Sequence, residues 1–305
     1  MHMSMLIWSI VAVTRFEFAP KAWAQLAKTL ESLRAINLPN RSVVRVLVAD
    51  NDTGPSARPI IDNTELPFEI TYIHAPARNI SIARNACLDA SKADFVAWID
   101  DDEIVDPNWL LHLYETLRQE SYGAVFGPAI AIYPPDAPKH IAKGDFHSNR
   151  PVLRQGEVRT GHTCNALVDM RPATTRALRF DIAKGRTGGE DTDYFHRLWQ
   201  TGARLGICET AQVFEDVAPA RMTPSWLMRR SFNAGHVFGE LSRRDARLWA
   251  LPKLVFLAMV KAAYCLILAL VSAGFATRRL WWLRRGVMHL GVMAGLVRLT
   301  PRAQY

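Results

Sequence analysis

The sequence predicts an α/β domain over residues 1–220 and a helical region over residues 221–305. Between residues 6 and 120, apolar runs rich in β-branched residues alternate with segments whose apolar residues recur at helical spacing. This alternation is typical of βαβ units on a mainly parallel sheet, arranged as a doubly wound layer or a half-barrel. Beyond residue 218 the chain becomes strongly basic and contains a long apolar run. With 305 residues and 49% apolar composition, the chain is long enough for one large core and a second element of another kind.

Strands of the α/β domain are expected where short apolar runs end in polar or turn-forming residues. The predicted strands cover residues 7–13, 43–49, 69–74, 95–99, 121–133 and 164–170. The predicted helices cover residues 21–35, 80–91, 106–118 and 189–200. Pro20 and Pro107 stand at two helix starts, where the fixed φ of proline suits the first turn. Residues 134–160 are rich in Pro, Gly and charge, so a mobile loop is expected there.

The formal charge of +8 is unevenly distributed along the chain. Residues 221–305 hold 14 Lys or Arg against two acids, which gives +12 and leaves −4 for residues 1–220. A basic total would ordinarily raise nucleic acid as a partner, but here the basic residues coincide with the apolar tail. The distribution therefore argues against nucleic acid and indicates an anionic membrane surface as the partner.

The C-terminal region is expected to associate with a membrane through three segments. Residues 225–244 predict a basic amphipathic helix, and residues 254–275 form an apolar run long enough to cross a bilayer. Residues 280–299 are also apolar, although Arg284, Arg285 and His289 interrupt them. Both flanks of the long run are positive, whereas a single crossing normally shows charge asymmetry. We expect in-plane helices or a shallow hairpin, with a short span or the core helices of a soluble second domain as alternatives.

The N-terminus has no cationic start and no small-residue cleavage site after its apolar run, so it predicts a first strand and no secretory signal. The four cysteines lie far apart, without a Cys-x-x-Cys pair or zinc-finger spacing. We expect reduced, structural thiols and a protein on the cytoplasmic face of the inner (plasma) membrane.

Four acidic residues, Asp100 to Glu103, directly follow the predicted strand over residues 95–99. Ligands of parallel α/β sheets bind where the strands end. So many carboxylates at one edge need a counterion, and a divalent cation both accepts carboxylate oxygen and bridges phosphate oxygens. Taken alone, the run could equally be a solvated acidic turn.

A second acidic group, Glu190, Asp191 and Asp193, stands at the start of a predicted helix and follows Gly188 and Gly189. The helix dipole favours acids at this position, but it explains one acid better than three. A carboxylate here can take a proton from a hydroxyl within hydrogen-bond reach. The glycines would let the backbone approach a substrate closely, or simply form a turn.

Four motifs, at residues 48–53, 79–86, 98–103 and 188–193, resemble in order and rough spacing those of family 2 glycosyltransferases with the GT-A fold. The resemblance is greatest to bacterial exopolysaccharide glucosyltransferases of the succinoglycan type and covers residues 5–220, and the basic tail is similar to the membrane-associating tails of that group. It implies a Rossmann-like nucleotide-diphospho-sugar transferase domain. It also implies a nucleoside-diphosphate sugar, with UDP as the expected nucleotide, and Mn²⁺ or Mg²⁺.

The resemblance also implies roles for the matching residues. Asp191 would be the general base, Asp102 the metal ligand, and Asp100 a ribose contact that also reaches the metal. The residues expected around the nucleotide sugar are Thr14, Asp50, Arg84, Asp100, Asp101, His162 and Glu190. Asn165 would line the donor or acceptor side.

Arg221, Arg229 and Arg230 are candidates to hold a diphosphate or lipid headgroups, because guanidinium forks suit phosphate. The Gln-x-x-Arg-Trp motif of processive synthases is missing after the Glu-Asp pair, which predicts transfer of a single sugar. The expected activity is inverting and metal-dependent, with a membrane-bound acceptor such as a polyprenyl-diphosphate oligosaccharide. The alternatives are a nucleotidyltransferase on a related fold and a non-catalytic, membrane-docked sugar-nucleotide-binding protein.

Overall fold

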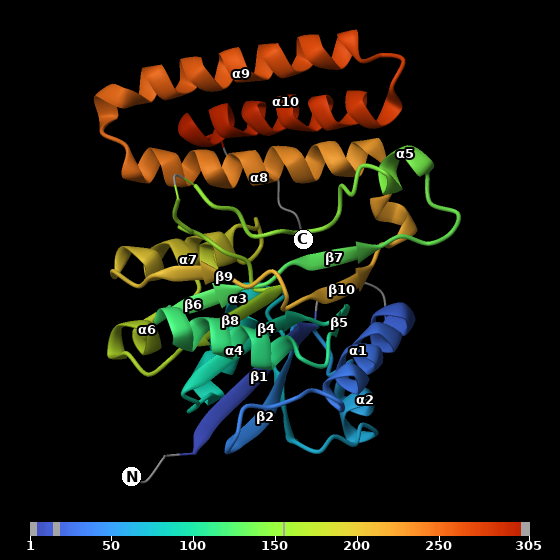
Figure 1. Ribbon diagram of the computed structural model, residues 1–305, viewed down its shortest axis with the longest axis vertical. Helices are drawn as coiled ribbons and strands as arrows, with labels where there is room; N and C mark the ends of the chain where they lie inside the picture. Colours follow the sequence, from blue (N-terminus) through green and yellow to red (C-terminus); the bar gives the residue numbers. More distant parts are fainter. Residues whose placement is uncertain (1–4, 15–18, 155, 300–305) are drawn as a thin grey trace.

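The computed structural model describes residues 5–14, 19–154 and 156–299, which form a seven-stranded central sheet, a smaller sheet and surrounding helices (Figure 1). In spatial order, the central strands are β3 (Glu69–His74), β2 (Ser42–Asp50), β1 (Leu6–Thr14), β4 (Phe95–Asp100), β8 (Asn165–Asp169), β6 (Ala124–Phe126) and β9 (Leu205–Ile207). The first four run parallel, whereas β8 is antiparallel to both of its neighbours. The smaller sheet contains β5 (Glu103–Val105), β10 (Val213–Asp216) and β7 (Ala129–Ile132). The predicted α/β class is confirmed.

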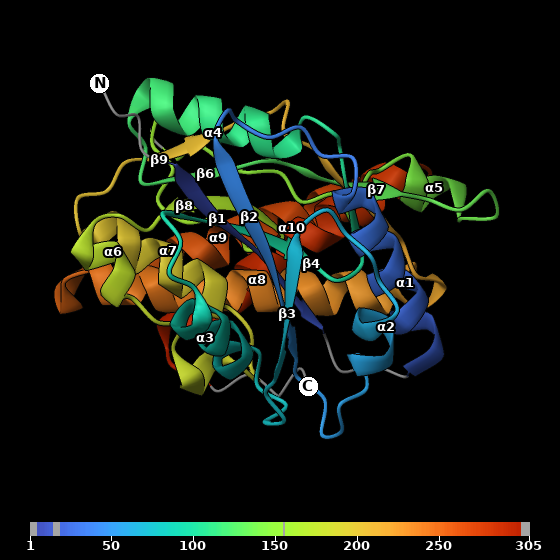
Figure 2. The same cartoon turned by 90° about the horizontal axis from the view of Figure 1, so that it is seen from below.

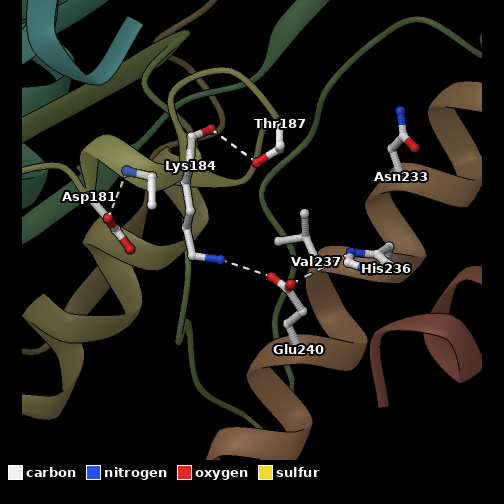
Figure 3. A pocket seen from close by; sticks show the side chains of 9 residues that line it. Asp181, Lys184, Thr187, Asn233, His236, Val237 and Glu240 are labelled. Atoms are coloured by element: carbon white, nitrogen blue, oxygen red, sulfur yellow. Dashed lines mark hydrogen bonds and ion pairs between the residues drawn. The ribbon is translucent and has the colours of Figure 1, made fainter. Parts of the chain in front are cut away.

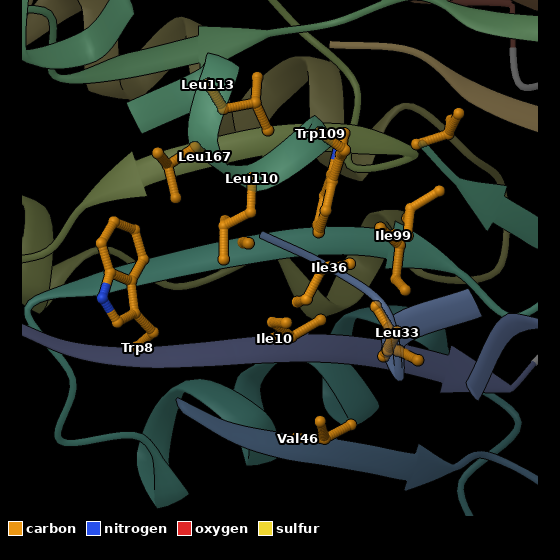
Figure 4. Close-up of a cluster of buried hydrophobic side chains, with 14 of the residues drawn as sticks. Trp8, Ile10, Leu33, Ile36, Val46, Ile99, Trp109, Leu110, Leu113 and Leu167 are labelled. Atoms are coloured by element: carbon orange, nitrogen blue, oxygen red, sulfur yellow. The ribbon is translucent and has the colours of Figure 1, made fainter. Parts of the chain in front are cut away.

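The side chains of β1 alternate between two hydrophobic cores, as the two-residue period of a strand requires. Trp8 and Ile10 belong to one core, with residues of α1 (Ala19–Leu33) and α4 (Trp109–Glu120) (Figure 4). Val11 and Val13 belong to the other, with residues of α3 (Ile80–Ala90) and α7 (Glu190–Gln200). Figure 2 shows α4 and α3 on opposite sides of the strands. Since each buried large apolar side chain contributes about 1.5–3 kcal/mol, these two cores fix the strand ends that carry the polar motifs.

Residues 121–133 were expected to form one strand, and this prediction is wrong. They form β6 and β7, which belong to different sheets and are separated by Gly127 and Pro128. A Cβ atom at Gly127 would lie 2.0 Å from the carbonyl oxygen of Ala211 and 2.4 Å from the Asn165 amide nitrogen. The chain therefore turns where another backbone approaches it closely, which apolar periodicity does not reveal.

The segment over residues 134–160, expected to be a loop, contains the short helix α5 (Lys139–Ala142). Ile141 and Phe146 are buried in a small core with Leu227 and Leu280 from the C-terminal helices. Residues 134–160 therefore connect the α/β domain with the C-terminal helices. The remaining short elements are α2 (Arg58–Asp62), α6 (Ala173–Ala177), η1 (Ile182–Lys184), η2 (Pro219–Arg221) and η3 (Leu248–Ala250).

The C-terminal region consists of three long helices stacked on the α/β domain (Figure 1). They are α8 (Pro224–Asp245), α9 (Leu251–Val271) and α10 (Ala276–Leu296), each close to the predicted position. Helix α8 lies on the domain, α10 packs on α8, and α9 is outermost (Figure 1). Gly235 lies against Met288, and Gly239, four residues later on α8, lies against Val292, four residues later on α10. Helices α8 and α10 therefore run in the same direction.

Glycines allow the backbones of α8 and α10 to approach closely, and we predict that Gly291→Ala separates them. A Cβ atom there would lie 2.0 Å from the carbonyl oxygen of Phe232. Although alanine is the better helix former by about 1 kcal/mol, this overpacking should lower the free energy of unfolding by about 1–3 kcal/mol overall. Thermal melts of the full chain in detergent would measure the loss. Gly274→Ala is the control, since a Cβ atom at Gly274 meets nothing within 4 Å. Equal melting temperatures for the two variants would contradict the close packing.

Candidate active site

The strand register brings three of the predicted residues to the same edge of the central sheet. Thr14, the last residue of β1, is the neighbour of Asp50 at the end of β2. Val13 is the neighbour of Asp100 at the end of β4. Because parallel strands place their carboxyl ends at one edge, these positions are adjacent although they are far apart in the sequence.

Asp50 is fully buried, and its carboxylate organises the loop that follows β2. Its Oδ2 accepts hydrogen bonds from the Ala57 amide at 2.8 Å and the Tyr72 hydroxyl at 2.9 Å, while Oδ1 accepts from the Asp52 amide at 3.0 Å. Burial and then Asp50 raise the pKa of Tyr72, which keeps this hydroxyl a donor. Asp50 therefore shapes the loop at the edge of the site, and its contact with a nucleotide base remains a prediction.

Arg84 connects α3, the end of β4 and the start of α7. Its side chain is 3% exposed, and Nη1 lies 2.5 Å from Glu190 Oε1 while Nη2 lies 3.8 Å from Asp100 Oδ1. Asn79 caps the N-terminus of α3, and its side-chain oxygen accepts hydrogen bonds from the amides of Ser81 and Ile82. Burial raises the pKa of Glu190, and the charge of Arg84 opposes this. The structure thus places Arg84 between two carboxylates, where it sets the position of both.

The acidic run after β4 is buried, so it is not a solvated turn. Asp100 is 9% exposed, Asp101 6% and Glu103 1%. Glu103 Oε2 accepts a hydrogen bond from the Asp100 amide at 2.7 Å, and Oε1 has no partner among the residues that the structure describes. Burial, followed by the charge of Asp100, raises the pKa of Glu103 well above its usual range. Sequence reasoning missed this inward-facing acid, because nothing local distinguishes it from its three neighbours.

Asp102, in the same acidic run, forms an ion pair with Arg221, which precedes the C-terminal helices. Its Oδ2 lies 3.5 Å from Arg221 Nη2, and Arg221 also pairs with Glu215. Within residues 5–14, 19–154 and 156–299, no three His, Cys, Asp or Glu side chains gather as a complete protein metal site. Mg²⁺ is often held by one or two carboxylates together with substrate phosphates. Asp100 and Asp102 fit that mode, in which a diphosphate supplies the remaining oxygens.

Asp191 lies in the first turn of α7, where it contacts His162. Its Oδ2 is 2.9 Å from His162 Nδ1, and its Oδ1 accepts a hydrogen bond from the Thr192 amide at 2.6 Å. Burial alone would raise the pKa of Asp191, but the charge and hydrogen bond of His162 bring it below its usual value. The His162 side chain is 48% exposed. Its partial burial lowers the pKa of His162, yet Asp191 raises this pKa more, so the net shift is upward. When His162 is protonated, the two side chains form an ion pair at the start of α7.

The other acid of this turn, Asp193, is structural. It pairs with Arg197 on α7 and with Arg244 on α8, and so fastens the C-terminal helices to the α/β domain. Asn165, expected at the donor or acceptor side, is also structural, because Trp109 donates to its oxygen while its amide group donates to the carbonyls of Pro128 and Ala211. Neither side chain is available to a substrate in this arrangement.

A cavity of about 310 Å³ lies between η1 and α8 (Figure 3). It borders Gly188. The next residue, Gly189, directly precedes α7 with a φ of +85°, and a Cβ atom there would lie 2.5 Å from Val237. Lys184 and Glu240 form an ion pair of 2.8 Å across it, and Asn233 lines its wall (Figure 3). The turn that carries Asp191 therefore adjoins a cavity that α8 lines on one side.

The chain is similar to known proteins both in sequence and in fold. Residues 9–185 match the model of the family described as Glycosyl transferase family 2. The chain is 43% identical over 283 residues to the succinoglycan biosynthesis protein ExoM of Rhizobium meliloti (strain 1021), and the match covers 92% of each chain.

Solved structures with the same fold include the mannosyltransferase PcManGT from Pyrobaculum calidifontis in complex with GDP-Man and Mn²⁺. That match has a TM-score of 0.65 and 16% identity, and it covers 97% of this chain and 89% of the other. TarS 1–349 of S. aureus, in complex with UDP-GlcNAc, matches with a TM-score of 0.54 and 12% identity, over 91% of this chain and 89% of the other. The GT-A-like fold expected from the motifs is thereby confirmed. With the family model matching more than half of the chain, this protein belongs to glycosyl transferase family 2 and is a glycosyltransferase.

Proposed function

We propose that the protein transfers a single sugar, with inversion and with the help of Mn²⁺ or Mg²⁺, from a nucleoside-diphosphate sugar to a membrane-bound acceptor. The observation that carries this proposal is the connection from Asp100 through Arg84 to Glu190, next to Asp191. These contacts link the edge of the sheet, where carboxylates suit a metal and a diphosphate, with Asp191, a carboxylate that can accept a proton. Membership of the family overturns the nucleotidyltransferase alternative, and the enzymatic assignment likewise argues against a non-catalytic binding protein.

The donor nucleotide is proposed to be UDP, and the acceptor a polyprenyl-diphosphate oligosaccharide in exopolysaccharide synthesis. Support for the pathway comes from the name of the relative, a succinoglycan biosynthesis protein. The neighbouring structures were solved with GDP-Man and Mn²⁺ or with UDP-GlcNAc, which supports a nucleotide sugar but leaves the nucleotide itself a proposal.

In the proposed reaction, Asp191 accepts the proton of the acceptor hydroxyl while that oxygen attacks the anomeric carbon from the face opposite the leaving diphosphate. A divalent cation, when bound by Asp100 and Asp102, would neutralise charge on the leaving diphosphate. Arg84 holds Glu190 in place beside Asp191, and the buried edge limits access of water. One displacement inverts the configuration at the anomeric carbon.

The C-terminal helices are proposed to hold the protein on the cytoplasmic face of the inner membrane. One helix among the described residues, Leu248–Val271 counted with η3, is long and apolar enough to cross a membrane, and 22% of its most apolar window is buried. It lies lengthwise on α10 and exposes large apolar side chains, among them Phe256, Leu270 and Val271 (Figure 1). This position supports a helix lying in the membrane interface, with basic residues of α8 and α10 near anionic headgroups.

The experiment that tests the function uses the full chain on vesicles that contain anionic lipid and a polyprenyl-diphosphate glycan. A panel of nucleotide sugars is supplied with Mn²⁺, with Mg²⁺ or with EDTA. We expect one UDP-sugar to be consumed faster than the others, and only with metal. Turnover that is equal in EDTA would contradict the proposed role of the metal.

The ion pair of His162 and Asp191 predicts a pH dependence. Asp191 and Glu190 favour the imidazolium and Arg230 disfavours it, and the net pKa of His162 is raised. The cation therefore persists above the usual pKa of about 6.5, and it keeps Asp191 paired until the imidazole loses its proton. We expect kcat to rise with pH through this raised pKa, and the rise to disappear in His162→Gln. A pH profile of kcat checks this, with His140→Gln on α5 as the control. An unchanged rising limb in His162→Gln would contradict the prediction.

A further inference from the structure

Three arginines lie near His147 at the junction of the α/β domain, α8 and α10. We call this group, Arg221, His147, Arg230 and Arg284, the junction cluster. The His147 ring stacks on Trp226 with 5.3 Å between centroids, and the Arg230 guanidinium lies 5.3 Å from the centre of the same indole. The cluster thus combines residues from η2, from the segment before β8 and from two helices.

The junction cluster begins at the proposed metal-binding edge. Arg221 reaches Asp102 at 3.5 Å, and its carbonyl oxygen accepts a hydrogen bond from His147 Nε2 at 3.0 Å. His147 Nδ1 in turn lies 2.9 Å from the Tyr133 hydroxyl, which fits a neutral imidazole that donates from Nε2 and accepts at Nδ1. Burial, followed by the charges of Arg230, Arg284 and Arg221, lowers the pKa of His147. His147 therefore joins the cations without adding a charge.

Arg284, at the other end of the junction cluster, is a half-buried cation. Its Nε donates to Ser231 Oγ at 3.2 Å, and its guanidinium lies 4.8 Å from the centre of the Phe146 ring. No carboxylate of the described residues lies within ion-pair distance of it. A guanidinium has five N–H donors, and a buried charge without a counterion is costly. Burial and then Arg230 lower the pKa of Arg284, as expected for a cation beside a like charge.

A phosphate-bearing ligand would supply the counterion that Arg284 lacks among the described residues. Guanidinium forks bind phosphate oxygens with two parallel hydrogen bonds, and a diphosphate offers enough oxygens for two arginines. His147 is buried, Arg221 and Arg284 are half-buried and Arg230 is exposed, so the cluster is open to solvent at Arg230 and lies apart from the exposed apolar side chains of α9 that would contact bulk lipid.

We infer that Arg230 and Arg284 form the subsite for the diphosphate of the acceptor, an inference that rests on the proposed function. The diphosphate of the donor belongs with Asp100 and Asp102, and Arg221 lies between the two positions. Arg284 comes from α10, which packs directly under the apolar helix α9 (Figure 1). The acceptor diphosphate would thus lie between the membrane-facing helices and Asp191, with its glycan directed towards the site.

Steady-state kinetics on the full chain separate the two substrates. Arg284→Gln should raise the KM for a polyprenyl-diphosphate acceptor about ten- to hundred-fold, because a charge-assisted contact is lost, and should leave the KM for the nucleotide sugar within about two-fold. Arg284→Lys should recover part of the loss, since it keeps the charge without the fork. The control is Arg285→Gln, an exposed arginine of the same helix that stacks on Trp281, with both KM values unchanged. A rise in the donor KM instead would overturn the inference.

Two measurements identify the source of the phosphate independently of turnover. Calorimetry with inorganic pyrophosphate, in EDTA and saturating UDP, should detect binding to the wild type and its loss in Arg284→Gln. Sedimentation with phosphatidylglycerol vesicles should be the same for both proteins, since loss of vesicle binding would assign Arg284 to bulk lipid and overturn the inference. If no nucleotide sugar reacted, the proposed function would be wrong. The binding of pyrophosphate would still test the subsite, because that measurement needs no turnover. Equal pyrophosphate binding by both proteins would defeat the subsite alone.

Discussion

Asp191→Asn is expected to lower kcat by about 10²- to 10⁴-fold, the range that a positioned general base contributes. The amide is nearly the same size as the carboxylate. Its oxygen can still accept a hydrogen bond from the Thr192 amide, and its NH2 group can donate to Nδ1 of a neutral His162, so the turn should persist. It cannot accept the hydroxyl proton. Initial rates at saturating donor and acceptor measure the effect, and the donor KM should change little.

Asp193→Asn is the matched control for this prediction, because it makes the same change two residues away on the same helix. Asp193 pairs with Arg197 and Arg244, so its loss should lower the melting temperature and leave kcat close to that of the wild type. If Asp191→Asn kept the wild-type rate, the general base would have to be another residue. His162, which contacts Asp191, would then be the next candidate.

Asp102→Asn is expected to lower kcat/KM for the donor by about 100-fold or more, since losing even an outer partner of a metal site commonly costs 10- to 100-fold. The amide keeps the shape but removes the charge that would attract the cation. The remaining rate should depend much less on Mn²⁺ or Mg²⁺ concentration. Titration of activity with each metal, with Asp62→Asn as an exposed acid-to-amide control, measures the effect.

Asp102→Asn could lower kcat/KM in another way, by displacing Arg221, which also pairs with Glu215. Melting temperature separates the two explanations, because loss of a metal ligand alone should leave the metal-free protein as stable as the wild type. Full activity of Asp102→Asn at low metal concentration would contradict the assignment of Asp102.

The position of the polar edge could be predicted from the sequence because it follows from local patterns. Apolar runs that end in Asp50 and Asp100 define two strands, and a parallel arrangement brings their ends together. The three C-terminal helices were likewise predicted close to their observed bounds, since their apolar and basic residues are continuous in sequence. The resemblance to a family then supplied roles that the pattern alone left open.

The partners of these side chains could not be predicted, because they lie far along the chain. Arg84 and Glu190 are 106 positions apart, and Arg284 and Ser231 are 53 apart. Local periodicity carries no information about such contacts. Arg284 appeared in the sequence only as an interruption of an apolar segment, and the structure shows that it faces Ser231 and Phe146 at the junction.

The expectation for Asp50 shows the same limit. Its place at the end of β2 followed from the sequence, but its hydrogen bonds to Ala57 and Tyr72 depend on the conformation of the loop and on β3. A base-binding acid and an acid that holds a loop have the same local sequence.

The central claim is that this family member transfers a sugar by one displacement from a nucleotide donor. The most direct measurement is ¹H NMR of the reaction with the best donor of the panel, read from the anomeric coupling of the donor and of the first product. The account predicts a product of the opposite anomeric configuration, formed only with a divalent cation and lost in Asp191→Asn. A product that keeps the configuration of the donor, or one formed at the same rate by Asp191→Asn, would contradict it.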